Sequence, residues 1–122
     1  MKKNFFFGSK EVFLVAEIGN NHEGSFKNAI KLIDKAAEAK VDAVKFQTYK
    51  TDLFLSNDIS EERKRQLKNF ELSYKDFEKI ANYAKKKGLI FFSTPFDIES
   101  ANFLNKLQPL FKIASSDNNF IQ

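Results

Sequence analysis

The sequence predicts an α/β protein in which parallel strands alternate with helices. Short runs of apolar, β-branched and aromatic residues alternate along the chain with longer segments whose apolar residues recur at helical spacing. The strand-like runs are apolar on both faces, which is typical of a parallel sheet that is covered on both sides. Strands and helices that alternate in this way form parallel pairs joined by right-handed crossovers. At 122 residues, the chain is one domain or part of one.

The first expected strand covers residues 12–19, and the first helix follows it. Residues 5–7 precede this strand across the Gly-Ser-Lys sequence at 8–10, a pattern that predicts a short hairpin arm. Ser25 has the position of an N-cap, and apolar residues then recur at helical spacing up to Ala37. Lysines and acidic residues occupy the positions between them, so this segment is expected to be an amphipathic helix.

The second strand is expected at residues 43–49, and a long polar stretch at 50–72 follows it. The charged run at 61–65 is interpreted as a solvated helical turn. The second helix begins after Ser73, with Asp76 three residues on as its capping-box partner. Gly88 ends this helix, in a position where a left-handed residue is favoured.

The third strand is expected at residues 89–96, where Pro95 stops it. Asp97 can cap a short helix that carries Leu104 on its apolar side, and the fourth strand is expected at 111–117. The order is therefore four parallel strands alternating with three helices. Two architectures fit this order: a small doubly wound sheet, or the first half of an eight-stranded barrel.

The composition excludes several classes of protein. The net charge is +4 and the basic residues form no patch or stripe, so no nucleic-acid partner is expected. No apolar run approaches the roughly 20 residues of a membrane helix, so no membrane partner is expected either. The basic start is interrupted by polar residues at 8–11, which argues against a secretion signal. With no cysteine there is no thiolate metal site, and the cytoplasm is the default compartment.

Polar residues gather where each expected strand ends. In parallel α/β folds, the carboxyl ends of the strands are the place where ligands bind. Four separate strands carry such residues at the same pole, which favours a binding site there. These residues are Glu17, Asn20, Asn21 and His22 after the first strand, Lys45 and Gln47 on the second, Ser93 and Thr94 on the third, and Lys112, Ser115, Ser116 and Asp117 on the fourth.

The chemistry of these side chains suits an anion. Alternation along a strand puts Lys45 and Gln47 on one face of the sheet. Lysines, hydroxyls and an amide can bind phosphate or carboxylate, and a lone carboxylate such as Glu17 can orient a hydroxyl or transfer a proton. A second interpretation stays open, in which Glu17 and Lys45 form an ion pair that only joins neighbouring strands.

His22 is the single histidine of the chain. A histidine in a polar loop beside two asparagines and a glycine is more often a turn residue than a catalyst. One histidine without partners at metal-ligand spacing is little support for a metal site, so no metal ligand is assigned in this chain.

Four motifs on successive strand ends resemble the N-acetylneuraminate (sialic acid) synthase family. They are AEIGNNHEG at 16–24, VKFQTY at 44–49, STPFD at 93–97 and FKIAS at 111–115, and FELSYKDF at 70–77 is also similar to that family. The resemblance implies that residues 1–122 are the N-terminal half of a (β/α)8 TIM barrel. The C-terminal half-barrel and a small antifreeze-like domain would then lie outside these residues.

The resemblance also implies an activity. The family condenses phosphoenolpyruvate with an N-acylated mannosamine-type sugar, giving a nine-carbon 2-keto sugar acid and free phosphate, and in bacteria it feeds surface polysaccharides. It uses a divalent metal, manganese or magnesium, whose ligands would lie outside this chain. The implied catalytic residues are Glu17, Lys45 and Asp117, and the implied substrate-binding residues are Gln47, Thr94, Lys112 and Ser115.

Two consequences are expected from a half-barrel, and one alternative to it stays open. The chain alone is expected to be inactive. Because a half-barrel has open sheet edges, a homodimer or a complementary half-barrel chain is expected as its partner. The alternative is a truncated, non-enzymatic α/β module that binds an anion or serves in assembly, and Ser116 favours it because relatives usually have glycine at that position.

Overall fold

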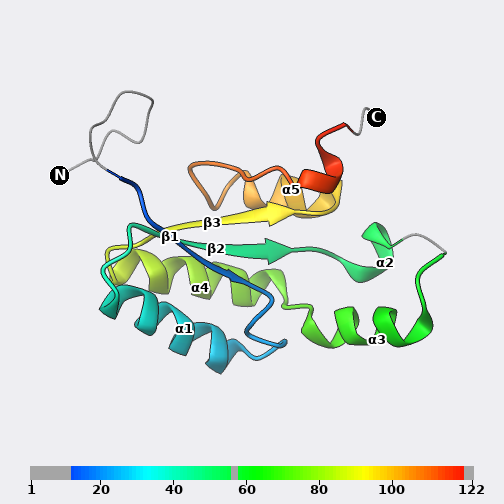
Figure 1. Ribbon diagram of the computed structural model, residues 1–122, viewed down its shortest axis with the longest axis horizontal. Helices are drawn as coiled ribbons and strands as arrows, with labels where there is room; N and C mark the ends of the chain where they lie inside the picture. The colour runs from blue at the N-terminus through cyan, green and yellow to red at the C-terminus, as the bar shows by residue number, and fades with distance from the viewer. Residues whose placement is uncertain (1–11, 56–57, 120–122) are drawn as a thin grey trace.

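The computed structural model of the protein describes residues 12–55 and 58–119. Its strands are β1 (Val15–Gly19), β2 (Ala43–Thr48) and β3 (Ile90–Pro95), and they form one sheet in the order β1-β2-β3 (Figure 1). Both strand pairs are parallel, as the sequence predicts. Over the two described ranges, no helix has the length and hydropathy that crossing a bilayer would take.

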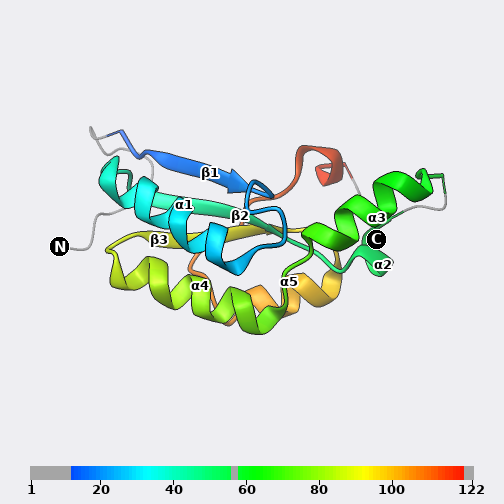
Figure 2. The same ribbon diagram turned by 90° about the horizontal axis from the view of Figure 1, so that it is seen from below.

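Five helices accompany the sheet within the same ranges. They are α1 (Phe26–Glu38), α2 (Thr51–Phe54), α3 (Glu61–Phe70), α4 (Tyr74–Lys86) and α5 (Ile98–Leu104). Figure 2 shows α1 and α4 running along the sheet and α3 extending past its end. The Ser25, Ser73 and Asp97 side chains cap α1, α4 and α5 by accepting hydrogen bonds from backbone N–H groups in the first turn, which confirms the three expected caps.

The core lies between one face of the sheet and the helices. Val44 and Phe46 of β2 are fully buried there, and the apolar sides of α1, α4 and α5 cover them. Residues that alternate with Val44 and Phe46 point to the opposite face. The helices therefore bury one face of the sheet and leave Lys45 and Gln47 on the other.

The polar stretch at 50–72 contains more helix than the sequence indicated. The charged run at 61–65 is the start of α3, which continues to Phe70. Leu67 explains this length, because it is the buried residue of α3 and its carbonyl accepts a hydrogen bond from the Tyr49 hydroxyl at 2.9 Å. The charged run is therefore part of a ten-residue helix with one buried side chain, where the sequence indicated only a solvated turn.

The expected fourth strand at 111–117 is wrong for this structure. Residues 111–114 belong to no helix or strand and pair with none of the three described strands, and a 3-10 turn at Ser115–Asp117 follows them. Phe111 and Ile113 remain 40% and 58% exposed, so the apolar faces that suggested a buried strand are uncovered. The expected hairpin arm at 5–7 lies outside the described residues.

Gln108 explains why the edge of β3 is not free for a fourth strand at this point. The Ser93 backbone N–H donates to Gln108 Oε1 at 2.7 Å, and Gln108 Nε2 donates back to the Ser93 carbonyl at 3.2 Å. A side-chain amide therefore takes the hydrogen bonds that the backbone of a neighbouring strand would make.

Candidate anion-binding site

Lys45 is the centre of a polar cluster on the open face of the sheet. Its Nζ atom lies 2.8 Å from Glu17 Oε2 and donates to Thr94 Oγ1 at 3.3 Å. Backbone pairing sets this geometry, because Glu17 lies beside Lys45 in the β1–β2 register and Gln47 lies beside Thr94 in the β2–β3 register. The three strands therefore bring together four of the residues that the sequence indicated.

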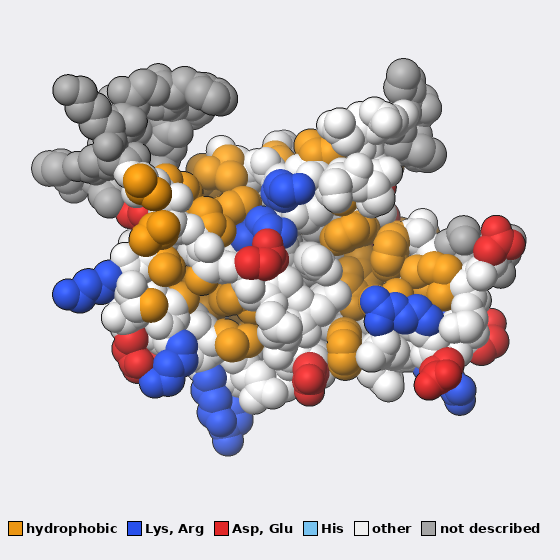
Figure 3. Space-filling view, viewed as in Figure 1, with side chains coloured by type: hydrophobic (Ala, Val, Ile, Leu, Met, Phe, Trp, Pro, Cys, Tyr) orange, Lys and Arg blue, Asp and Glu red, His pale blue; other side chains and the backbone are white. Residues whose placement is uncertain are grey.

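The cluster is buried on one side only. The Lys45 side chain is 12% exposed, whereas the Glu17 side chain is 56% exposed. A nearly buried ammonium group needs a partner, and a carboxylate that still reaches water supplies one. The expected Glu17–Lys45 ion pair is thus confirmed. In the space-filling view, basic and acidic side chains meet near the centre of the visible face (Figure 3).

Gly19 and Asn20 complete the cluster. Asn20 was one of the polar residues expected at this pole of the sheet, whereas no role was expected for Gly19. Asn20 Nδ2 donates to Gln47 Oε1 at 2.9 Å. Gly19 has a φ angle of 52°, and a Cβ atom there would lie 3.3 Å from Glu17 Oε1 and 3.7 Å from Gln47 Nε2. Glycine at this position gives the left-handed turn and leaves space for both side chains.

The cluster has hydrogen-bond donors to spare. An ammonium group has three protons and Lys45 uses two of them, while the Thr94 hydroxyl accepts from Lys45 and keeps its own proton. Gln47 Nε2 makes no hydrogen bond to any described residue. This donor set suits the oxygens of an anion. However, Glu17 balances the charge of Lys45, so a doubly charged ligand would need a second cation.

The residues expected from the fourth strand do not join this cluster. Lys112 Nζ donates to the carbonyl of its neighbour Ile113, and Ser115 is exposed. Asp117 accepts from the Ser116 hydroxyl at 3.2 Å. The chain does turn between Lys112 and Ser115, as their opposite parity requires if both are to face one ligand. The roles of these three residues stay predictions.

Ser93 and His22 have structural surroundings. The Ser93 hydroxyl is buried and lies 2.7 Å from Thr48 Oγ1. His22 is 1% exposed, its ring stacks on Phe46, and its Nδ1 accepts the Gly24 N–H at 3.1 Å. Burial lowers the pKa of His22 to about 4, so the ring is neutral at pH 7. These contacts agree with the interpretation of His22 as a turn residue.

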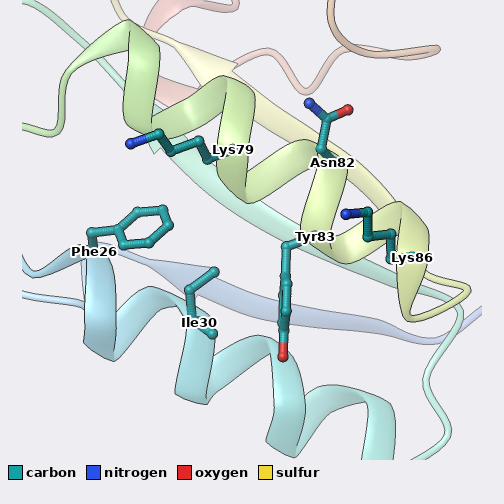
Figure 4. Close-up of a pocket in the computed structure, with 6 residues that line it drawn as sticks. All are labelled: Phe26, Ile30, Lys79, Asn82, Tyr83 and Lys86. Atoms are coloured by element: carbon teal, nitrogen blue, oxygen red, sulfur yellow. The ribbon is translucent and has the colours of Figure 1, made fainter.

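A groove of about 510 Å³ lies between α1 and α4, on the helical side of the sheet (Figure 4). Phe26 and Ile30 line it from α1, and Lys79, Asn82, Tyr83 and Lys86 line it from α4. Lys79 lies over the Phe26 ring, and the Tyr83 hydroxyl donates to Asp34 at 2.8 Å. The groove is therefore separate from the polar cluster, and its lining contains no carboxylate or imidazole that could act as an acid or a base.

A parallel α/β chain with a donor-rich polar cluster on its strands is typical of enzymes that bind phosphorylated or carboxylated small molecules. The comparison with known families makes this class specific. A sequence model of the NeuB family matches residues 32–122, so the chain belongs to the NeuB family. The resemblance to sialic acid synthases is thereby confirmed.

Individual relatives agree with the family. An uncharacterized protein of Methanocaldococcus jannaschii is 40% identical over 109 residues, which cover 88% of this chain and 32% of the relative. Pseudaminic acid synthase of Campylobacter jejuni is 35% identical over 129 residues, covering 93% of this chain and 38% of the relative. The chain thus spans about a third of the length of these relatives.

A solved structure has the same fold. The N-acetylneuraminic acid (sialic acid) synthetase of Leptospira borgpetersenii, crystallised in complex with citrate, superposes with a TM-score of 0.83 at 37% identity. The match covers 88% of this chain and 38% of the synthetase chain. Both the parallel sheet and the order of strands and helices therefore belong to a known synthase fold.

Proposed function

We propose that the protein containing this chain condenses phosphoenolpyruvate with an N-acylated amino sugar, giving a 2-keto sugar acid and free phosphate. The polar cluster around Lys45 is the observation that carries this proposal. Phosphoenolpyruvate has a phosphate and a carboxylate, and the cluster offers an ammonium, a hydroxyl and an amide as donors. Relatives named as sialic and pseudaminic acid synthases, one of them crystallised with a carboxylate ligand, support the same chemistry.

The residues of the cluster take different parts in this proposal. Lys45 and Thr94 bind oxygens of phosphoenolpyruvate, and Gln47 donates from the same side. Glu17 is the exposed partner of Lys45, so its carboxylate can orient a sugar hydroxyl or accept a proton. When the anion binds, Glu17 releases Lys45 and turns toward the sugar.

Lys112 is the second cation in the proposal. A dianion on Lys45 alone would leave one negative charge unbalanced, and Lys112 is exposed and paired only with a neighbouring carbonyl. Pairing of residues 111–117 with the edge of β3 would bring Lys112, Ser115 and Asp117 toward the cluster. This strand pairing would complete the anion site.

A barrel supplies the means for that pairing. We take the chain as the first half of a (β/α)8 barrel whose edges are covered by further polypeptide, from the same protein, a second copy or a complementary chain. Val12 and Leu14, which precede β1, and Val15, its first residue, are exposed apolar residues that support this, because such an edge favours association. The 122 residues alone are then inactive.

A divalent metal, manganese or magnesium, is part of the family expectation, but the described residues do not provide its site. Within residues 12–55 and 58–119, no group of three or more histidine, cysteine or acidic side chains could hold a metal ion. Glu17 is the acidic residue of the cluster, and it is paired with Lys45. The metal ligands would have to come from outside the described residues, and no step is derived through them.

A non-enzymatic anion-binding module is the second candidate. It is favoured by one observation, the failure of Lys112, Ser115 and Asp117 to reach the cluster. Such a module would bind phosphoenolpyruvate or another anion through Lys45 and turn nothing over. An amino-sugar substrate and a location in the cytoplasm are parts of the enzymatic proposal and not of this second candidate.

Phosphate release separates the two candidates. The assay uses phosphoenolpyruvate, manganese and a panel of N-acylated amino sugars. It is run on the 122-residue chain and on the complete translation product read downstream of the codon for Gln122. The enzymatic proposal predicts sugar-dependent release from a longer product and none from the chain alone. If every longer product that carries the later strands binds phosphoenolpyruvate but releases no phosphate, the anion-binding module is the remaining candidate.

A further inference from the structure

We infer that Asn20 is a positioning residue, which decides which end of the Gln47 side-chain amide faces the polar cluster. The amide of Gln47 has a donor end and an acceptor end, and strand geometry alone selects neither. Asn20 Nδ2 donates to Gln47 Oε1 at 2.9 Å, across 27 residues of sequence. This hydrogen bond holds the acceptor end away from the cluster and turns the donor end toward it. The inference takes only the identity of the ligand from the proposed function.

The position of Gln47 Nε2 supports this inference. A Cβ atom built on Gly19 would lie 3.7 Å from Gln47 Nε2 and 3.3 Å from Glu17 Oε1, so the amide nitrogen and the carboxylate lie beside the same glycine. Gln47 Nε2 has no acceptor among the described residues. Gln47 is also the register partner of Thr94 and shares the face of Lys45, so its unpaired donor is available to an oxygen of an incoming anion.

The oxygen of the Asn20 side-chain amide indicates that the orientation of this amide is constrained. Asn20 Oδ1 is buried and has no hydrogen-bond partner in the described structure. A buried oxygen without a partner costs free energy, and native structures keep few of them. Turning the Asn20 amide over would not help, since Oδ1 would then face Gln47 Oε1. The donor contact to Gln47 is therefore kept while the oxygen of Asn20 stays unpaired.

The orientation of the Gln47 amide determines whether the cluster accepts a negatively charged ligand. With Nε2 inward, the amide donates to a phosphate, carboxylate or carbonyl oxygen. With Oε1 inward, it would add an acceptor beside the Glu17 carboxylate and repel the same ligand. Asn20 thus favours anions without contacting them.

Asn20→Asp tests this role, because it keeps the size of the side chain and removes its donor at neutral pH. The Gln47 amide is expected to turn over, and the dissociation constant for phosphoenolpyruvate at pH 7.5 should rise about tenfold, the loss of one charge-assisted hydrogen bond. Below about pH 4 most of the introduced carboxyl is protonated and can donate to Gln47 Oε1 again, so the ratio of mutant to wild-type dissociation constants should fall toward one. Asn21→Asp, an exposed neighbour in the same loop, adds an equal charge without touching Gln47 and is the matched control.

A second readout needs no ligand. In ¹⁵N-labelled chain, the Gln47 Nε2 protons are unpaired in the wild type and should gain a hydrogen bond in Asn20→Asp, which moves their signals and slows their exchange with water. Unchanged Gln47 signals would overturn the inference, as would equal affinity of wild type and Asn20→Asp for phosphoenolpyruvate. Signals that move in a chain with no affinity for phosphoenolpyruvate would support the role of Asn20 and count against the proposed function. If Asn20→Asp does not fold, Asn20→Ala removes the donor, and Gln47 signals that stay as sharp as in the wild type would overturn the inference.

Discussion

The polar side chains of the three paired strands and those of the C-terminal segment differ in what holds them. Glu17, Lys45 and Thr94 are fixed by the register of the sheet, and the three meet within hydrogen-bonding distance. Lys112 lies on a segment that pairs with none of the three described strands, Ser115 begins the 3-10 turn that follows it, and both residues are exposed. Residue types that suit an anion occur in both regions. Backbone pairing is what brings one set together into a site.

Lys45→Met is expected to have the largest effect. It keeps the aliphatic stem and removes the only cation of the cluster within the described residues, so affinity for phosphoenolpyruvate should fall at least about thirtyfold, the value of a charge-assisted contact. Lys112→Met in the 122-residue chain should change the affinity less than about twofold, because Lys112 does not reach the cluster. Isothermal titration calorimetry measures both. Equal losses in the two variants would contradict the difference between the regions.

The region of the three paired strands, with the loop that carries His22, should also show a pH dependence of stability. Burial lowers the pKa of His22 to about 4, from 6.5 in the unfolded chain. Between these values the unfolded state binds more protons, so the free energy of unfolding should fall by about 3 kcal/mol as the pH drops from 7 to 4. Denaturant unfolding across this range measures the change. His22→Asn keeps an acceptor near the Gly24 N–H and removes the titration, so its profile should be flatter.

The single histidine allows a direct check of the same prediction. The midpoint of its ring-proton NMR titration should lie near pH 4. A midpoint near 6.5 would mean that the loop after β1 is open to water in solution, and it would make the two regions more alike.

Gln108→Ala tests whether Gln108, at the edge of β3, separates the paired strands from the C-terminal segment. The substitution leaves the Ser93 N–H and carbonyl unpaired, and we expect a loss of about 1–2 kcal/mol in the free energy of unfolding. Urea unfolding gives this value. The same variant opens the edge to residues 111–117 or to a second chain, so self-association in size-exclusion chromatography should increase. An unchanged stability would contradict the role given to Gln108.

Glu17→Gln should have the smallest effect, and its sign is informative. Glu17 balances the charge of Lys45, so removing its charge should improve the affinity for phosphoenolpyruvate about threefold, by making the cluster positive. The same variant should abolish phosphate release in a complete enzyme, if the carboxylate acts on the sugar. A weaker affinity for the anion would show that Glu17 takes part in holding it.

The sequence predicted those elements whose cause is local. The α1 and α4 helices follow from capping serines and a regular apolar side, and the core position of Phe46 follows from alternation along β2. The same alternation predicted that Lys45 and Gln47 share the open face. The occupation of the β3 edge by Gln108, by contrast, depends on a contact with Ser93, 15 residues away, that no sequence pattern displays.

Long-range contacts account for what the sequence did not predict. The motif at 111–115 looks like a strand by composition, but a strand also needs a partner, and the edge of β3 is occupied at Ser93. The sequence placed Asn20 among the polar residues at the strand ends, but its contact with Gln47 was not predicted, because the two residues are 27 positions apart. The burial of His22 likewise depends on Phe46, which is distant in sequence.

The most direct measurement is a titration of ¹⁵N-labelled chain with phosphoenolpyruvate, followed residue by residue by NMR. The predicted result is that backbone and side-chain signals of Gly19, Lys45, Gln47 and Thr94 shift together with one dissociation constant, while signals of α1 and α4 stay in place. Shifts confined to the groove lined by Lys79 and Lys86, or no shifts at millimolar ligand, would contradict the assignment of the anion site to the strands.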